Sequence, residues 1–297
     1  MTDTHSSPAS AHRIRLAAVL TLSLIILAVE VAGGIAANSL ALLADAGHML
    51  TDVTGIALAL VAIWFAGRSP TDGRTYGFLR LEILATVANA FLLFGIAAVV
   101  MFEAWQRLAS PPHIGSGPML AVAVVGMAGN AASLYLLRDA QRVSLNMRGA
   151  YLEVMGDFAG SAAVIVAAVA IGLTGWTAAD ALASALIGIL ILPRTFQLLR
   201  EATHILMEGT PKGVSVEHVR QHILDAPGVV DCHDLHVWTI TSGVNVVSAH
   251  VVLADGVDPA VTLDALCACL STDFDIEHST FQLESQDRRR LEQRSHA

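Results

Sequence analysis

Six apolar segments, each long enough to cross a bilayer, recur through the first two thirds of the chain. They lie at about residues 16–37, 40–66, 81–106, 117–137, 150–173 and 178–199. A hydrocarbon core about 30 Å thick needs about 20 helical residues, so each segment predicts a membrane-spanning helix. Only 14% of the 297 residues are charged, whereas soluble domains carry about 25%. The sequence therefore predicts a membrane protein with six spans.

The placement of arginine predicts the orientation of these spans, because cytoplasmic loops are enriched in Lys and Arg. Arginines precede the first span, fill the second and fourth connections and end the sixth span: Arg13, Arg15, Arg68, Arg74, Arg80, Arg138, Arg142, Arg148, Arg194 and Arg200. The first, third and fifth connections offer only Arg107. We therefore expect a multi-pass protein of the inner (cytoplasmic) membrane with both termini in the cytoplasm. Its parts are a cytoplasmic tail at 1–13 and a six-span transmembrane domain at 14–208.

Two pairs of ionisable residues lie inside the predicted spans. His48 and Asp52 are four residues apart in the second span, and Glu153 and Asp157 repeat that spacing in the fifth. Positions i and i+4 of a helix share one face, so each pair can bind one ligand. Ionisable groups at bilayer depth cost at least ~2.5 kcal/mol each, which confines them mainly to functional cavities. Four donors of these kinds suit a tetrahedral divalent metal ion.

A structural role is the alternative for these residues, which would then pair with one another or with arginines. Asp45, three residues before His48, is a candidate to orient the imidazole, or it occupies a water-exposed helix end. Interhelical hydrogen bonding is the alternative to an ion or proton role for the remaining polar groups of the spans, Glu30, Glu82 and Asn89.

Three carboxylates crowded into one site predict competition between a metal ion and protons. They cannot all ionise at low dielectric unless a cation is present. Metal binding requires deprotonated ligands and therefore releases protons. A site that faces alternate sides of the membrane would turn this competition into metal–proton antiport. The metal is then a transported substrate, and we expect no cofactor.

The last third of the chain reads as a water-soluble α+β domain. The stretch SVEHVRQHILDAPG predicts a helix with its first serine as N-cap, and LHVWTIT and VNVVSAHVVL are strand-like runs separated by Ser242-Gly243, a hairpin signal. Residues 259–272 look helical and 276–284 extended. We expect a domain at 209–285 with helices on one face of a sheet, and a disordered tail at 286–297.

Five stretches of the chain resemble motifs of the cation diffusion facilitator family, in its zinc, cobalt and cadmium efflux branch. They are SLALLADAGHMLTD, RTYGFLRLEILATVANA, GAYLEVMGDFAGS, ADALASALIGILIL and HDLHVWTITSG. The resemblance covers about residues 14–285. It implies a membrane all-α six-helix transport domain followed by a small α+β ferredoxin-like cytoplasmic domain, and a homodimer. It also implies export of divalent cations from the cytoplasm in exchange for protons, with zinc as first choice and cobalt or cadmium as alternatives.

The resemblance also bears on the metal ligands. In zinc-transporting relatives the fifth-span motif usually begins with His, whereas here it begins with Glu153. In the α+β domain, His233, His250 and His278 match positions that bind a regulatory metal in relatives, with Glu284 as a fourth candidate. Each histidine reads equally well as a surface residue. The connections SPTDGRTYGF and LRDAQRVSLNMRG lack the histidines of some relatives, so we expect no metal site in either.

The other histidines and cysteines of the α+β domain give weaker signals. His218 and His222 are four apart on a helix, on a face that we expect to be solvated. Cys267 and Cys269 point about 200° apart on a helix, so a shared metal is disfavoured and core packing is favoured for at least one. Cys232, beside His233, is a weak candidate ligand.

Three other functions compete with antiport. A membrane-embedded metal hydrolase is disfavoured because the motif H-E-x-x-H is absent. A membrane metal sensor would not need ligands at bilayer depth, and a metal uniporter would move the ion without protons. The net charge of −9 gives no support to a nucleic-acid partner.

Overall fold

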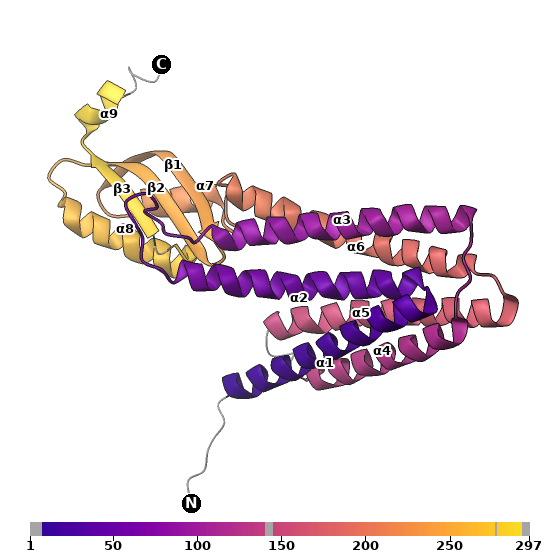
Figure 1. Cartoon of the computed structure of the whole chain (residues 1–297). Coiled ribbons are helices and arrows are strands. Elements are labelled where there is room, and N and C mark those ends of the chain that lie inside the picture. Colours follow the sequence, from indigo (N-terminus) through magenta and orange to yellow (C-terminus); the bar gives the residue numbers. More distant parts are fainter. Residues whose placement is uncertain (1–7, 140–144, 277, 293–297) are drawn as a thin grey trace, which may run out of the picture. The chain divides into compact units, whose positions relative to one another are not determined.

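The computed structural model describes residues 8–139, 145–276 and 278–292 (Figure 1). Half of the expected N-terminal tail, Arg142 of the fourth connection and the last five residues lie outside these ranges. The chain forms two compact units, Met1–Ala57 with Ala88–Gln197 and Leu58–Val87 with Leu198–Ala297.

Six long helices match the six expected spans. They are α1 (Pro8–Ala37), α2 (Leu40–Ala66), α3 (Leu81–Ala109), α4 (Ser116–Leu137), α5 (Leu145–Thr174) and α6 (Ala178–Leu206). Each contains a stretch long and apolar enough to cross a bilayer, which confirms the predicted number of spans. Two bounds differ from expectation. Residues 8–13, expected in a tail, belong to α1, and α6 continues to Leu206 instead of ending near residue 199.

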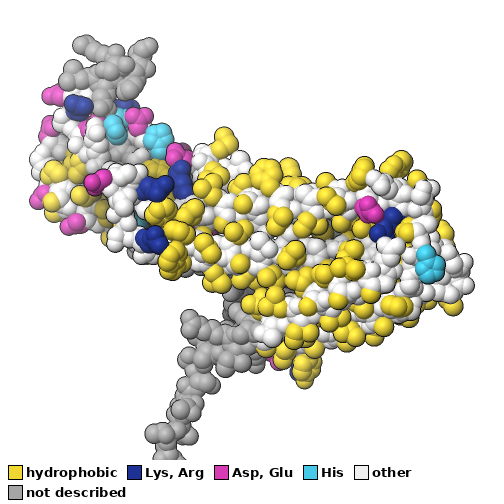
Figure 2. Space-filling view, viewed as in Figure 1, with side chains coloured by type: hydrophobic (Ala, Val, Ile, Leu, Met, Phe, Trp, Pro, Cys, Tyr) yellow, Lys and Arg dark blue, Asp and Glu magenta, His cyan; other side chains and the backbone are white. Residues whose placement is uncertain are grey.

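Large apolar side chains face outward along these helices, and Figure 2 shows hydrophobic side chains spread over the whole visible helical surface. Val99, Trp105 and Leu173 are 68%, 73% and 82% exposed. Exposed apolar surface of this kind suits contact with lipid rather than water. Inside the first unit, α4 packs against both α1 and α5, and the core contains many small residues, among them Ala41 and Ala168. Small residues allow helices in a membrane to approach closely.

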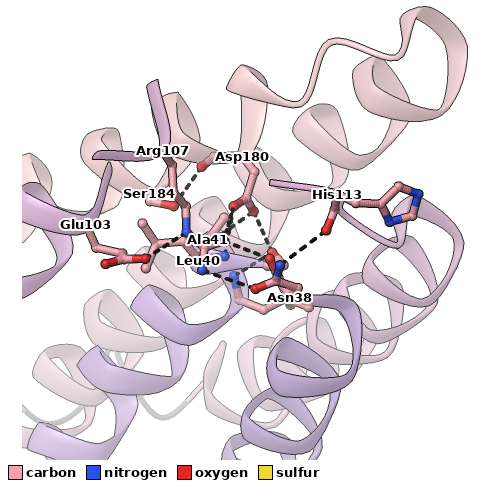
Figure 3. A network of polar contacts seen from close by, with 10 residues as sticks. Asn38, Leu40, Ala41, Glu103, Arg107, His113, Asp180 and Ser184 are labelled. Atoms are coloured by element: carbon pink, nitrogen blue, oxygen red, sulfur yellow. Dashed lines mark hydrogen bonds and ion pairs between the residues drawn. The ribbon is translucent and has the colours of Figure 1, made fainter. Parts of the chain in front are cut away.

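A buried carboxylate joins α6 to the beginning of α2 (Figure 3). Asp180 accepts hydrogen bonds from the Ser39 hydroxyl at 2.6 Å and from the backbone amides of Leu40 and Ala41 at 2.8 and 3.1 Å. The first backbone amides of a helix have no hydrogen-bond partner within the helix. They lie at the positive end of the helix dipole, which favours an anion. Asp180 therefore fixes the start of α2 through the chemistry of a helix N-terminus.

Arg107 supplies the opposite charge at this junction. Its guanidinium lies 3.5 Å from Asp180 and donates hydrogen bonds to the Asn38 carbonyl at 2.7 Å and the Glu103 carboxylate at 3.1 Å. Asn38 has φ 53° in the turn between α1 and α2, a left-handed conformation that asparagine tolerates. The network thus joins α3 and α6 to the α1–α2 turn and leaves Asp180 paired, as a buried charge requires.

The α+β domain contains a three-stranded sheet in the order β1-β2-β3. Its elements are α7 (Val216–Leu224), β1 (Val229–Thr241), β2 (Val244–Leu253), α8 (Pro259–Phe274), β3 (His278–Glu284) and α9 (Gln286–Glu292). β1 and β2 form the predicted antiparallel hairpin, and β3 lies parallel to β2. Ser215 caps α7 as predicted, since its side chain accepts a hydrogen bond from His218 N.

One face of this sheet packs against α7 and α8. Val247 and Val251 of β2 share a core with Ile223 of α7 and with Leu266 and Leu270 of α8. Helices on one face of a sheet are the predicted arrangement. The expected disordered tail differs, because its residues 286–292 form α9.

Asp180→Ala should destabilise the protein by about 3–5 kcal/mol, because it leaves Arg107 and the α2 amides without their buried partner. Thermal unfolding of the purified protein in detergent measures this change. Glu103→Ala is the matched control, since Glu103 is 42% exposed and an exposed ion pair contributes about 0–1 kcal/mol. Equal melting temperatures for the two variants would contradict the structural role of Asp180.

Candidate metal sites

Three of the four predicted ligands in the spans come together between α2 and α5. His48 Nε2 lies 3.8 Å from Asp52 Oδ2 and 3.9 Å from Asp157 Oδ1, and one ligand atom from each residue lies within 4.8 Å of the others. The side chains of His48 and Asp157 are 14% and 5% exposed. The predicted i,i+4 relation of His48 and Asp52 is therefore seen, and α5 adds a carboxylate from across the helix interface.

Glu153, the fourth predicted ligand, is not one of these three residues, although it lies close to Asp52. Its carboxylate accepts a hydrogen bond from the Arg194 guanidinium of α6 in a close ion pair, while its other oxygen has no hydrogen-bond partner in the described part of the chain. Sequence reasoning missed Arg194, which we took to mark the end of the sixth span. Apolar residues continue beyond it to Leu206, and that continuation was the signal that the arginine lies inside a helix.

Asp45 fills neither of its two expected roles, because it forms no hydrogen bond with the His48 imidazole and does not lie at a water-exposed helix end. It is buried and forms a hydrogen bond with Ser161 of α5, whereas His48 Nδ1 has no hydrogen-bond partner among the described residues. Asp45 also lies close to α5, because a Cβ added at Gly160 would be 2.7 Å from its Oδ1. Glycine at that position lets the carboxylate approach the helix backbone.

A second group of buried polar residues surrounds Asp45. Glu30 of α1, Asn130 of α4 and Ser161 are each 1% exposed, and Asn130 donates a hydrogen bond to Ser161 at 3.4 Å. Both Glu30 carboxylate oxygens lack a hydrogen-bond partner within the ranges that the structure describes. A Cβ added at Gly126 would lie 2.6 Å from Glu30 Oε1. Hydrogen bonds of this group therefore link α2, α4 and α5, which interhelical packing alone would also explain.

Glu82 and Asn89, the other polar candidates of the spans, have structural neighbours. Glu82 accepts a hydrogen bond from the Thr241 hydroxyl at the end of β1, at 2.6 Å. The amide group of Asn89 lies against Gly55, where an added Cβ would be 2.8 Å away. These contacts favour packing roles for both residues.

A second His and carboxylate cluster lies on the sheet of the α+β domain. Glu284 Oε1 is 3.0 Å from His250 Nδ1, and Glu284 Oε2 is 3.3 Å from His233 Nε2. The strand register explains this arrangement, because His233 pairs directly with His250 and Glu284 pairs with Val252, two residues further along β2. Residues two apart on a strand share a face. Two imidazoles and a carboxylate are donors that zinc accepts.

The other two candidates of this domain lie away from the cluster. His278 begins β3, six residues before Glu284, so the two are about 20 Å apart along the strand. Cys232 pairs with Val251 and belongs to the apolar core under the helices, on the face opposite His250. A side chain on that face does not reach the cluster, and burial raises the pKa of the Cys232 thiol.

The fold defines a multi-pass membrane protein, and clusters of the residue types that bind metals lie in its spans and on its sheet. The chain belongs to the cation efflux family. The model of the cation efflux transmembrane domain matches residues 16–207, and the model of the cation efflux protein cytoplasmic domain matches residues 211–286.

Several curated relatives match most of the chain. The metal cation efflux system protein CzcD of Cupriavidus metallidurans is 44% identical over 94% of this chain and 89% of its own. The zinc transporter ZitB of Escherichia coli is 39% identical over 87% of this chain and 83% of its own. A cadmium, cobalt and zinc/H(+)-K(+) antiporter of Bacillus subtilis is 39% identical over 76% of this chain and 74% of its own. A solved metal-bound C-terminal domain of CzcD is 42% identical over 24% of this chain and 99% of its own, with a TM-score of 0.23.

Zinc should stabilise the fragment 209–297 through the sheet cluster. A ligand at 100 times its Kd adds about 2.7 kcal/mol, which in a small domain corresponds to roughly 10–20 °C in Tm. Thermal unfolding with and without zinc measures this gain. His233→Ala and Glu284→Ala should each reduce this gain, whereas His278→Ala, the matched control, should keep it. A gain that depends on His278 but not on Glu284 would contradict this assignment.

Proposed function

We propose that this protein exports divalent metal ions from the cytoplasm in exchange for protons, with zinc as the principal substrate and cobalt or cadmium as further ones. The observation that carries the proposal is the cluster of His48, Asp52 and Asp157 inside the membrane-spanning helices. Membership of the cation efflux family supports the transport of a cation. The name of CzcD supports metal efflux, and the name of ZitB supports zinc as a substrate.

The distances in the cluster suit a tetrahedral ion after a small adjustment. Two nitrogen or oxygen ligands on zinc, each about 2.0–2.1 Å from the metal, lie about 3.3 Å apart. The contacts of His48 with Asp52 and Asp157 are 3.8 and 3.9 Å, so the ion would draw the ligands about 0.5 Å closer. Glu153 is the fourth ligand in this proposal, and it reaches the ion only after leaving Arg194.

Proton exchange follows from the charges that surround the site. Three negative charges would lie in a region of low dielectric, on Asp52, Asp157 and Glu153. The Arg194 guanidinium offsets the charge of its ion-pair partner Glu153. When no metal is bound, protons reduce this repulsion, and when metal binds they must leave. The name of the Bacillus subtilis relative, an antiporter that includes H(+), supports the same coupling.

The remaining features of the proposal concern location and assembly. We place the protein in the inner membrane with both termini in the cytoplasm, because arginines gather in the second and fourth connections. The match of residues 211–286 to a family cytoplasmic domain supports this orientation. We assign homodimerisation to the same domain, and regulation by metal to its cluster of His233, His250 and Glu284.

Asp52→Ala and Asp157→Ala should each lower zinc flux by more than about tenfold, a loss of at least ~1.4 kcal/mol in binding. Each removes a charged oxygen ligand while leaving the helix intact. The measurement is zinc entry into proteoliposomes under a pH gradient, with proton movement followed in parallel. Asp72→Ala, at an exposed position, is the matched control.

The same assay separates the competing functions. A sensor would show no flux in the unmodified protein, and a uniporter would show flux without proton movement. Near-normal flux in Asp52→Ala would exclude the proposed site.

Arg194→Gln should tighten zinc binding at the membrane site by about fivefold or more, or ~1 kcal/mol. The change removes a cation that competes with the metal ion for Glu153 and that also repels the metal ion. Isothermal titration of the protein in detergent measures the Kd. Arg194→Lys should behave like the unmodified protein, and Arg200→Gln, an exposed arginine of the same helix, should have no effect. Weaker binding in Arg194→Gln alone would show that Arg194 supports the site instead.

A further inference from the structure

A third group of metal-binding residues lies on the helical side of the α+β domain. His222 Nδ1 is 3.3 Å from Cys269 Sγ and 3.3 Å from Asp273 Oδ2, and Cys269 Sγ is 3.7 Å from the same carboxylate. One ligand atom from each residue lies within 4.8 Å of the others. The three therefore converge on one point from two different helices.

The packing of α7 against α8 produces this convergence. His222 lies in the last turn of α7, next to Ile223, which packs with Leu266 and Leu270 of α8. Cys269 and Asp273 are four residues apart on α8, so they share one helical face. The edge of the Phe274 ring contacts the His222 ring at a centroid distance of 5.0 Å, which limits the orientations open to the imidazole.

Sequence reasoning missed this group because it searched for partners on the same helix. His222 was considered only together with His218, and Cys269 was considered only as a possible partner of Cys267 at a shared metal. In the structure Cys267 is 3.3 Å from the Ser279 hydroxyl of β3, away from Cys269. Core packing was expected for at least one of these cysteines, but both are half-buried, and the buried one is Cys232.

We propose that His222, Cys269 and Asp273 form a separate metal site that binds a thiophilic divalent cation, namely zinc, cadmium or cobalt. Nitrogen, sulfur and carboxylate oxygen are the three donor types of zinc sites. With zinc bonds of about 2.0–2.3 Å, neighbouring ligands lie about 3.3–3.6 Å apart, close to the 3.3–3.7 Å seen here. A thiolate selects such ions against magnesium, calcium and manganese.

The site differs from the two other clusters in chemistry and in access. The membrane cluster and the sheet cluster contain only histidines and carboxylates. The His222 and Asp273 side chains are 42% and 46% exposed, whereas Glu284 of the sheet cluster is 1% exposed. Three protein ligands leave a fourth tetrahedral position for water. The site is thus an open one that can exchange metal with the surrounding solution, and it does not depend on the transport function.

Cobalt titration of the full-length protein in detergent, with a non-thiol reductant, tests the proposal. Cobalt bound to a thiolate gives a charge-transfer absorption band that histidine and carboxylate ligands do not give. Because the other two clusters lack cysteine, the band reports on cysteine-containing sites alone. We expect a band that saturates as cobalt is added and that disappears when zinc or cadmium is added in excess.

Variants then assign the band to its residues. Cys269→Ser should abolish it, and His222→Ala should weaken cobalt binding by about tenfold or more, the order of one lost ligand. Cys267→Ser and His218→Ala are matched controls, each one turn or less away on the same helix, and both should retain the band. Circular dichroism and zinc flux of Cys269→Ser should match those of the unmodified protein.

The outcomes are decisive in both directions. Absence of the band in the unmodified protein, or its loss in Cys267→Ser with retention in Cys269→Ser, would overturn the proposal. A normal band in a protein without zinc flux would leave this site standing while refuting the proposed transport function.

Discussion

A charge inside a hydrocarbon layer must be neutralised, and this requirement organises the helical unit. At Asp180 it is met fully, because three hydrogen bonds and the Arg107 guanidinium surround one carboxylate. At the cluster of His48, Asp52 and Asp157 it is met only in part, since the shortest contacts between these side chains are longer than hydrogen bonds. The first arrangement is that of a structural ion pair, and the second leaves room for a further cation.

Arg194 occupies an intermediate position between these two cases. Its partner Glu153 lies one turn from Asp157 on α5, yet half of the Arg194 side chain is exposed. This ion pair is less completely buried than the one between Arg107 and Asp180, whose side chains are 14% and 0% exposed. The protein therefore carries a positive group beside its acidic cluster that holds one carboxylate.

The sequence predicts relations within one element far better than relations between elements. The pair of His48 with Asp52 follows from helical periodicity, and the six spans follow from hydropathy. The link from Glu153 to Arg194 depends on how α5 and α6 pack, and Glu284 reaches His250 only through the parallel register of β3 with β2. His222 and Cys269 meet across two helices for the same reason. Spacing along a chain does not encode these distances.

The junction at Asp180 imposes an order on the biosynthesis of the protein. The amide of Leu40 and the carboxylate that satisfies it are separated by 140 residues. At translation rates of about 5–20 residues per second, roughly 7–30 s pass between the synthesis of the two. During that interval the start of α2 must keep its amides near water or the headgroups, because the hydrocarbon offers no partner. The hydrogen bonds that satisfy the start of the second helix can therefore form only once the beginning of the sixth helix has been made.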